Sequence, residues 1–347
     1  MPGVVDDVPL LLDDGGEAGT AARPRPRRSS SSPSPSRGGG GATPTATTLI
    51  LLGDMFGLGA LSLPSVFARL GWLPATSLLI LFSVSTIYSS RLFALLCRLA
   101  PRARVFDDYG SLALGNLGRK LTYLSVYLCI FFEPPIFAVT VAESLKVLGL
   151  FSNSKTSIAI ATTLIMLPLA QVKELEGVAA FSAVGVAGMV VAVAAAVVSL
   201  LRVPNNSPPP LFLPPNPKQI FLEYNNGPDN TRLVLRTSSG VPLSSLAAAF
   251  FDVVFTFGGQ VNWNRYTTGM RDPSLFPSCV AVAVALMSSS YLLVGGLGCK
   301  VLGSDFDFSK PLTSLLPPGL DVVVANVGLL AHTLLAFQIN VNGKKKE

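Results

Sequence analysis

Long runs of apolar residues constrain this chain more than any other feature of its sequence. A helix that crosses about 30 Å of hydrocarbon needs about 20 mostly apolar residues, and eight runs approach or reach that length. They do not alternate between apolar and polar residues as strands would, so each run predicts a transmembrane helix. The predicted spans are 47–68, 71–90, 121–145, 157–172, 179–201, 241–261, 274–297 and 322–341.

The composition agrees with these runs. Only 13% of the residues are charged and the mean hydropathy is +0.53, whereas an ordinary soluble domain has about 25% charged residues. The chain is therefore predicted to be an all-α integral membrane protein.

The first predicted span contains residues that interrupt helices. The stretch "GDMFGLGALSLP", Gly53 to Pro64, holds a carboxylate, three glycines and a proline. Gly57 and Gly59 allow the backbone to unwind, and in a membrane a break is tolerated only where it faces protein or a polar cavity. The half-helix after such a break presents N–H groups that suit a carboxylate, and the half-helix before it suits a cation. Small residues also allow helices to pack closely, and this alternative remains open.

The sixth span carries a second interruption. In "AAAFFDVVFTFGGQVNWNRY", Gly258 and Gly259 follow Phe257, whose ring is placed to form an aromatic wall at the break. Breaks in spans one and six are typical of two halves related by an internal repeat, with a binding site between them at the middle of the membrane.

The basic residues predict the orientation. With the N-terminus in the cytoplasm, 17 of the 26 Lys and Arg residues fall on the inner side, as the positive-inside rule requires. They flank spans instead of forming one patch, so the net charge of +6 indicates topology and contact with the lipid bilayer, not binding of nucleic acid.

Two polar segments lie outside the predicted spans. Residues 1–45 are rich in Ser, Pro, Gly and Arg and predict a disordered cytoplasmic tail. Residues 202–240 predict an outer loop, in which Asn205 begins an acceptor pattern for N-glycosylation. The remainder, 46–347, is predicted to be one transmembrane domain.

The tail also contains an acidic pair followed by three leucines, in the string from Asp6 to Leu12. This order looks like a sorting signal for vacuolar or endolysosomal membranes. The plasma membrane remains the alternative location.

Several motifs together resemble the amino acid/auxin permease family, also called the amino acid transporter transmembrane domain. They are "GLGALSLPSVFARLGW", "DDYGSLALGNLGRK", "FTFGGQVNWNRYTTGMRDPSLFPS" and "VLGSDF", in that order. The resemblance implies a LeuT-like, inverted-repeat fold and secondary active transport of amino acids by alternating access. The family usually has eleven spans, so a chain with eight is expected to hold an incomplete second repeat.

The resemblance also implies a substrate site. Five residues of span one would surround the carboxylate and amine of the substrate, and two residues of span six would face them. These residues are Phe56, Gly57, Leu58, Gly59 and Ala60, with Phe257 and Gly258 opposite. Many relatives have a His where this chain has Gln260, so no proton-carrying role is expected there.

Ionisable residues within membrane spans are candidates for ion coupling, with H⁺ or Na⁺ as the coupling ion. The acidic candidates are Asp54, Glu133 and Asp252, and each has the alternative of a hydrogen-bonded acid that fixes helix packing. His332 is the only histidine, for which a satisfied core residue is the alternative. Thr333 offers a hydroxyl to sodium, or to its own helix.

The leading hypothesis is therefore a coupled amino-acid symporter. The alternative is a truncated, non-transporting interaction or sensor protein of the same family. The sequence has no P-loop and no nucleophile elbow, and its four cysteines lack a CxxC spacing. An enzyme, a cofactor and a metal site are not expected.

Overall fold

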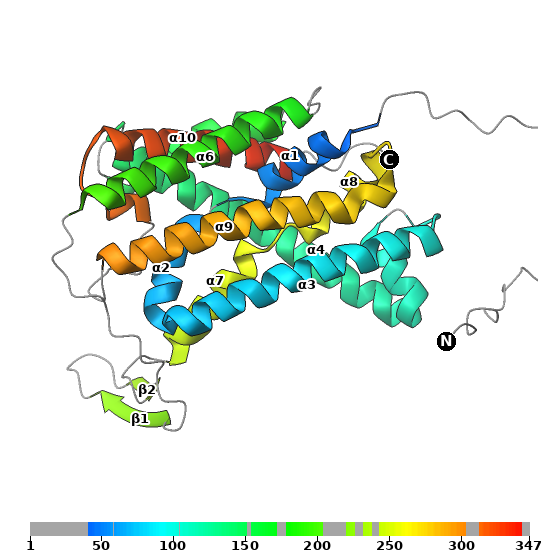
Figure 1. Ribbon diagram of the computed structural model, residues 1–347, viewed down its shortest axis with the longest axis horizontal. Coiled ribbons are helices and arrows are strands. Elements are labelled where there is room, and N and C mark those ends of the chain that lie inside the picture. The colour runs from blue at the N-terminus through cyan, green and yellow to red at the C-terminus, as the bar shows by residue number, and fades with distance from the viewer. Residues whose placement is uncertain are drawn as a thin grey trace, which may run out of the picture. The chain divides into compact units, whose positions relative to one another are not determined.

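The structure of the protein is a computed structural model that describes residues 41–57, 59–103, 105–150, 154–171, 178–203, 220–225, 232–237, 243–302 and 312–341. The described helices are α1 (Pro44–Met55), α2 (Gly59–Leu70), α3 (Trp72–Leu99), α4 (Phe106–Val147), α5 (Lys155–Gln171), α6 (Val178–Arg202), α7 (Leu243–Thr256), α8 (Trp263–Gly269), α9 (Phe276–Leu302) and α10 (Leu320–Val341). Short 3₁₀ helices are η1 (Gln260–Asn262), η2 (Pro273–Leu275) and η3 (Leu312–Ser314). All of these elements belong to the unit Gly40–Glu347, and Figure 1 colours them in chain order.

Within the described ranges, six helical segments are long and apolar enough to cross a membrane. They are α3, α4, α6, α9, α10 and the segment Leu243–Gly269, which includes α7 and α8. The pair α1 and α2, bent by 56°, makes a seventh if it is one span. The run predicted at 157–172 forms α5, which has 17 residues and is shorter than these six. The prediction of a multi-pass helical membrane protein is confirmed, and six or seven of the eight predicted spans reach this length and hydropathy.

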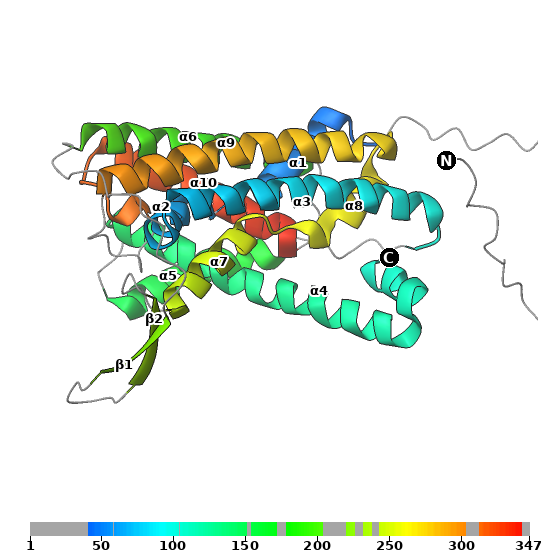
Figure 2. The same cartoon turned by 60° about the horizontal axis from the view of Figure 1, so that its bottom comes forward.

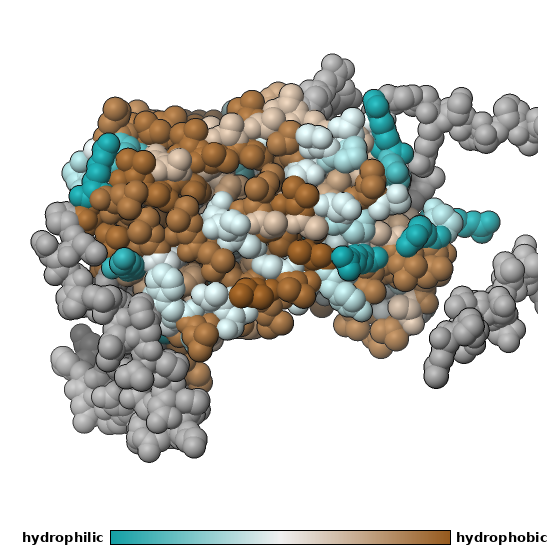
Figure 3. All heavy atoms as spheres, in the orientation of Figure 1, coloured by the Kyte–Doolittle hydropathy of each residue, from teal (hydrophilic) through white to brown (hydrophobic). Residues whose placement is uncertain are grey.

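The helices expose apolar side chains, as contact with lipid requires. Figure 3 shows apolar residues along the helices of one face and hydrophilic residues toward the helix ends. Helix α4 is the most exposed of these six spans. In its most apolar 18-residue stretch 6% of the residues are buried, whereas 61% are buried in the corresponding stretch of α10. Figure 2 shows α4 at the edge of the group of helices. Phe131 and Tyr127 of α4 are therefore placed to face lipid.

Small residues bring α6 and α10 together, and the two helices lie side by side in both ribbon views (Figures 1 and 2). A Cβ atom at Gly188 would lie 2.7 Å from the Gly328 carbonyl oxygen, and a Cβ at Gly328 would meet the Gly188 carbonyl in turn. Only glycine fits at such a crossing. The main buried core lies beside it, among α1, α2, α6, α7 and α9.

The predicted outer loop contains a β-hairpin. Strand β1 (Ile220–Asn225) pairs antiparallel with β2 (Arg232–Thr237), with Ile220 opposite Thr237. The all-α prediction did not include these strands, because their short runs lie in a proline-rich polar loop. The glycosylation candidate Asn205 lies outside the described residues.

The start of the described chain is held against the loop between α8 and α9. Thr43 caps α1 through its hydroxyl, which accepts from the Ala46 N–H at 3.2 Å. The Ala42 N–H donates to the Gly269 carbonyl at 2.8 Å, and the Arg271 N–H donates to the Ala42 carbonyl at 3.0 Å. Residues 1–40 of the predicted tail, with its sorting string, lie outside the described residues.

Candidate functional site

The first interrupted span breaks between α1 and α2. Phe56 leaves the helical conformation with φ −81° and ψ 78°. The Gly57 N–H then donates to the Met55 carbonyl at 3.0 Å, and the Ala60 N–H donates to the Gly57 carbonyl at 3.1 Å. These turn bonds satisfy part of the backbone that the break frees. Leu58, the central residue of the predicted site, lies outside the described residues.

The second interruption follows the end of α7 at Thr256. The Gly258 N–H donates to the Phe255 carbonyl at 2.9 Å, and the Gln260 side-chain amide donates to the Phe257 carbonyl at 2.6 Å. Gly259 has φ +102°, a conformation that favours glycine. Gln260, for which no proton-carrying role is expected, therefore satisfies a carbonyl at the break.

The two breaks pack against each other, and a glycine in each break leaves room for the other chain segment. A Cβ at Gly59 would lie 2.7 Å from Thr256 Cβ, and a Cβ at Gly259 would lie 2.8 Å from Met55 Cγ. The same glycines thus lie at the helix breaks and at the close contacts, so the structure shows both the interruption and the close packing considered from the sequence.

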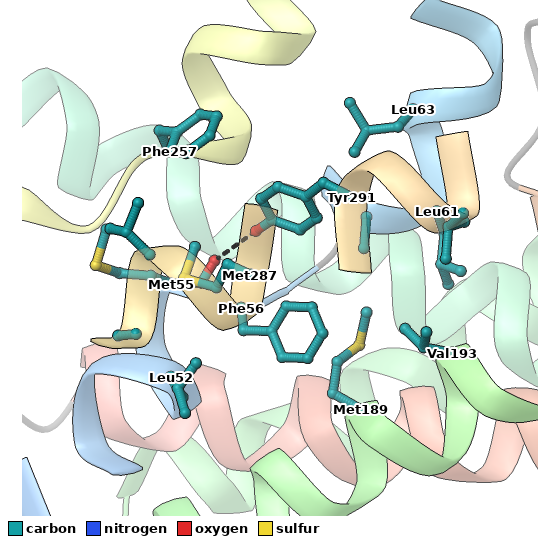
Figure 4. Packing of buried hydrophobic residues seen from close by; sticks show 14 of the residues in the cluster. Leu52, Met55, Phe56, Leu61, Leu63, Met189, Val193, Phe257, Met287 and Tyr291 are labelled. Carbon is teal, nitrogen blue, oxygen red and sulfur yellow. Dashed lines mark hydrogen bonds between the residues drawn. The ribbon is translucent and has the colours of Figure 1, made fainter. Parts of the chain in front are cut away.

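Tyr291 of α9 joins the breaks from the side (Figure 4). Its buried hydroxyl lies 3.4 Å from the Met55 carbonyl oxygen and 3.2 Å from the Thr256 carbonyl oxygen. One hydroxyl proton serves both acceptors. The ring packs 5.9 Å from Phe56 and 5.8 Å from Phe257, measured between centroids.

The other described members of the predicted substrate site surround this junction. Phe56, Gly59, Ala60 and Phe257 are buried, whereas Gly57 and Gly258 are half-buried. Figure 4 shows Phe56 between Tyr291 and Met189 of α6. A cavity of about 480 Å³ lies elsewhere, between the end of α4 and the start of α10, and no predicted substrate residue lines it.

Asp54 lies one turn before the first break and bonds to the segment that follows the second. The Asn262 side-chain amide donates to both carboxylate oxygens, at 3.2 and 3.1 Å, and also to the Asn340 side-chain oxygen at 2.6 Å. The two protons of that amide suffice for the two partners. Helices α1 and α10 and the segment η1 therefore meet at one polar cluster.

Further polar groups surround Asp54. Arg265 and Glu133 both lie within electrostatic range of it, and the Arg265 guanidinium donates to the Ile339 carbonyl at 3.3 Å. Glu133 comes from α4 and precedes Pro134 inside that helix. The structure thus brings two of the three acidic candidates together.

Asp252 lies apart from this cluster. Its carboxylate lies 3.9 Å from the Arg69 guanidinium at the end of α2, and its side chain is 40% exposed. The pair joins the end of α2 to α7, which fits the packing alternative for Asp252.

His332 and Thr333 of α10 have different surroundings. His332 is 1% exposed, and its Nδ1 lies 3.0 Å from the Gly185 carbonyl oxygen of α6. Its Nε2 faces the first break, 3.4 Å from the position that a Cβ at Gly57 would take. The Thr333 hydroxyl donates to the Leu329 carbonyl of its own helix at 2.7 Å, which is the alternative considered for it.

The loop after the second break is exposed. The Arg271 Nε donates to the Gly41 carbonyl at 2.8 Å. Asp272 accepts from the Ser274 hydroxyl at 2.6 Å and from the Ser274 N–H at 3.0 Å, and these bonds lower the pKa of the Asp272 carboxyl.

Comparison with known proteins agrees with this arrangement. A family model described as "Transmembrane amino acid transporter protein" matches residues 40–342. The chain belongs to that family. Its members are named as transporters rather than enzymes, and the resemblance seen in the motifs is confirmed.

Individual relatives of this transporter family come from Arabidopsis thaliana. "Amino acid transporter AVT1H" is 26% identical over 293 residues, covering 82% of this chain and 61% of the relative. "Amino acid transporter AVT1D" is 24% identical over 271 residues, covering 74% and 44%. "Amino acid transporter AVT1J" is 30% identical over 146 residues, covering 39% and 34%. The chain thus spans less than two thirds of the length of these relatives.

Sequence reasoning missed three residues that join the two breaks: Tyr291, Asn262 and Asn340. Tyr291 had a usable signal, because a tyrosine in the middle of an apolar span needs a partner for its hydroxyl. The two asparagines had a weaker signal, since the Asp54 contacts join positions 208 residues apart and no local pattern reveals such a pairing.

Proposed function

We propose that this chain forms the substrate-binding part of a secondary active transporter that moves amino acids across a membrane by alternating access. The observation that carries the proposal is the junction of two interrupted spans, joined through Tyr291 and through Asp54 and Asn262. Interrupted helices that meet within the membrane supply backbone groups for a polar substrate in a region that otherwise excludes it.

The substrate carboxylate is assigned to the start of α2, where the first N–H groups of the half-helix and its positive dipole end favour an anion. The residues concerned are Phe56, Gly57, Leu58, Gly59 and Ala60. Phe257 and Gly258 form the opposite side. The family membership and the proximity of the two breaks support this assignment.

The fold is proposed to be LeuT-like, with α5 as a further span and residues 46–347 as the transmembrane domain. Placing the span of α1 and α2 and the span of α7 and α8 at corresponding positions of an inverted repeat accounts for why both spans are interrupted. The N-terminus is placed in the cytoplasm, which puts Asn205 on the outer side, where it can be glycosylated. A vacuolar or endolysosomal membrane is the proposed location, with the plasma membrane as the alternative.

Coupling to H⁺ or Na⁺ is assigned first to Asp54. Its carboxylate bonds to Asn262, so any change in its charge or ligation reaches the segment after the second break. Glu133, within electrostatic range, is the second candidate. Asp252 and Thr333 have other partners, which makes them weaker candidates.

The test is uptake by the purified chain in proteoliposomes. Each of the common L-amino acids is offered under an imposed pH gradient and, separately, under a sodium gradient. Asp54→Asn is expected to abolish gradient-driven accumulation, while Glu143→Gln, which alters a half-buried acid paired with Lys146, is expected to retain it. Uptake of no amino acid under either gradient contradicts the transport proposal. Binding without uptake would then favour the sensor alternative.

A further inference from the structure

We infer that His332 accepts a hydrogen bond from the ammonium group of the substrate at the break between α1 and α2. The inference rests on the proposed function, because it takes the substrate to be an amino acid held at that break. It assigns to His332 a role in binding the substrate rather than in carrying the coupling proton.

The packing of α6 against α10 fixes the orientation of the imidazole ring. The glycine crossing at Gly188 and Gly328 brings the helices close, and the His332 Nδ1 lies 3.0 Å from the Gly185 carbonyl oxygen. A carbonyl oxygen only accepts hydrogen bonds, so this partner assigns the proton of the neutral ring to Nδ1. The Nε2 atom then carries a lone pair and acts as an acceptor.

The free nitrogen of His332 faces the first break. A Cβ at Gly57 would lie 3.4 Å from Nε2, so glycine at this position leaves the nitrogen open toward the break. Among the residues that the structure describes, none forms a hydrogen bond with Nε2. The side chain is 1% exposed, so bulk water has little access to this nitrogen, and a ligand that brings a donor to the break would complete its hydrogen bonding.

An ammonium group is the donor that fits this nitrogen. It carries N–H protons, whereas a carboxylate would place its lone pairs against the lone pair of Nε2. The start of α2 at Gly59 favours the carboxylate for the opposite reason, because it presents N–H groups. The two ends of an amino acid therefore have separate partners, on α2 and on α10, which orients the substrate across the break.

The test compares ligands that differ only in their amine protons. Equilibrium binding to the purified chain is measured by calorimetry for the L-amino acid that the wild type binds most tightly, for its N-methyl form and for its N-trimethyl form. The trimethyl form keeps the positive charge but has no N–H. The wild type is expected to bind the parent and the N-methyl form at least about tenfold more tightly than the trimethyl form, as for the loss of a charged hydrogen bond.

Two variants and a matched control then isolate the contribution of His332 to binding. His332→Leu is expected to weaken binding of the parent amino acid about tenfold and to leave the trimethyl form unchanged. Asn326→Leu is the matched control, since it removes another buried polar side chain of α10, whose amide bonds within its own helix. Gly57→Ala covers Nε2 from the other side without altering the ring, and is expected to weaken the parent selectively. The melting temperature of each variant identifies any that fails to fold.

The outcomes separate this inference from the proposed function. Equal losses for parent and trimethyl ligand in His332→Leu and Gly57→Ala, or no loss for either, would overturn it. Unchanged binding with loss of proton-driven uptake in His332→Leu would also overturn it and make the residue a proton carrier. A wild type that binds amino acids with the expected selectivity but transports none would support the His332 contact while contradicting transport. A wild type that binds no amino acid would overturn both.

Discussion

The break between α1 and α2 is short, whereas the break after α7 extends from Phe257 through η1 to Asn262. At the first break, tight turn bonds satisfy part of the backbone, and the Tyr291 hydroxyl serves the Met55 carbonyl together with the Thr256 carbonyl, where the second break begins. At the second, a side chain of the same segment, Gln260, performs that task. The first break therefore depends on a neighbouring helix, while the second is partly self-supporting.

This difference indicates which break is suited to hold a ligand. The first is lined by residues of other helices, with Thr256 and His332 both facing its glycines. The second is fixed by its own glycine conformation and by the bond from Asn262 to Asp54. We expect the first break to respond to substrate and the second to transmit that response to the cluster around Asp54.

The largest expected effect is at Gly259. Gly259→Ala places a side chain at φ +102° and against Met55 Cγ at 2.8 Å. Backbone strain of this kind costs about 1–3 kcal/mol, and the contact adds to it. We expect a marked fall in the melting temperature in detergent. Gly269→Ala is the control, because a Cβ there meets nothing within 4 Å, and equal melting temperatures of the two variants would refute the distinction.

A smaller effect is expected from the glycines of the first break. Gly59→Ala brings a methyl group 2.7 Å from Thr256 Cβ, whereas among the described residues Gly57→Ala meets only His332 Nε2, at 3.4 Å. Overpacking of this kind costs about 1–3 kcal/mol, so Gly59→Ala should destabilise the protein and Gly57→Ala should not. Thermal unfolding of the pair measures the difference. Similar stability of both variants would mean that the breaks do not rely on close contact.

The interruptions themselves could be predicted from the sequence, because glycines cluster beside a carboxylate and a proline in one apolar run and as a Gly-Gly pair in another. The positions of Gly57, Gly59, Gly258 and Gly259 follow from this reasoning. The span count could not be settled in the same way, since the run at 157–172 forms a helix of only 17 residues. The helix length depends on where the chain leaves the helix, which apolar composition does not specify.

The partners of the site residues were beyond sequence reasoning for a physical reason. Asp54 bonds to Asn262, and His332 to Gly185, across 208 and 147 positions of the chain. Helical periodicity fixes which residues share a face of one helix, but it does not determine which helices become neighbours. The acidic candidates thus looked alike in the sequence, and the structure separates them by their partners.

Tyr291→Phe tests the dependence of the first break on α9. The substitution removes the hydroxyl that lies beside the Met55 and Thr256 carbonyls and leaves buried acceptors without it, at a cost of about 1–3 kcal/mol. We expect a lower melting temperature and weaker amino-acid binding together. Tyr88→Phe is the control, since Tyr88 is 61% exposed on α3. Stability and binding equal to the wild type would show that neither break depends on the Tyr291 hydroxyl.

The smallest expected effect lies in the loop beyond the second break. Ser274→Ala removes the hydroxyl that donates to Asp272 and leaves the backbone N–H bond in place, so the pKa of Asp272 should rise toward its ordinary value. A carboxyl whose pKa is lowered in the folded state stabilises the protein above its unfolded pKa, and this contribution is lost as the pH falls through the folded pKa. The melting temperatures of variant and wild type should therefore differ slightly at neutral pH and converge in acid. Because Asp272 is fully exposed, solvent screening keeps the difference small. A large change at neutral pH would instead mean that the second break depends on this loop, and that it is not self-supporting.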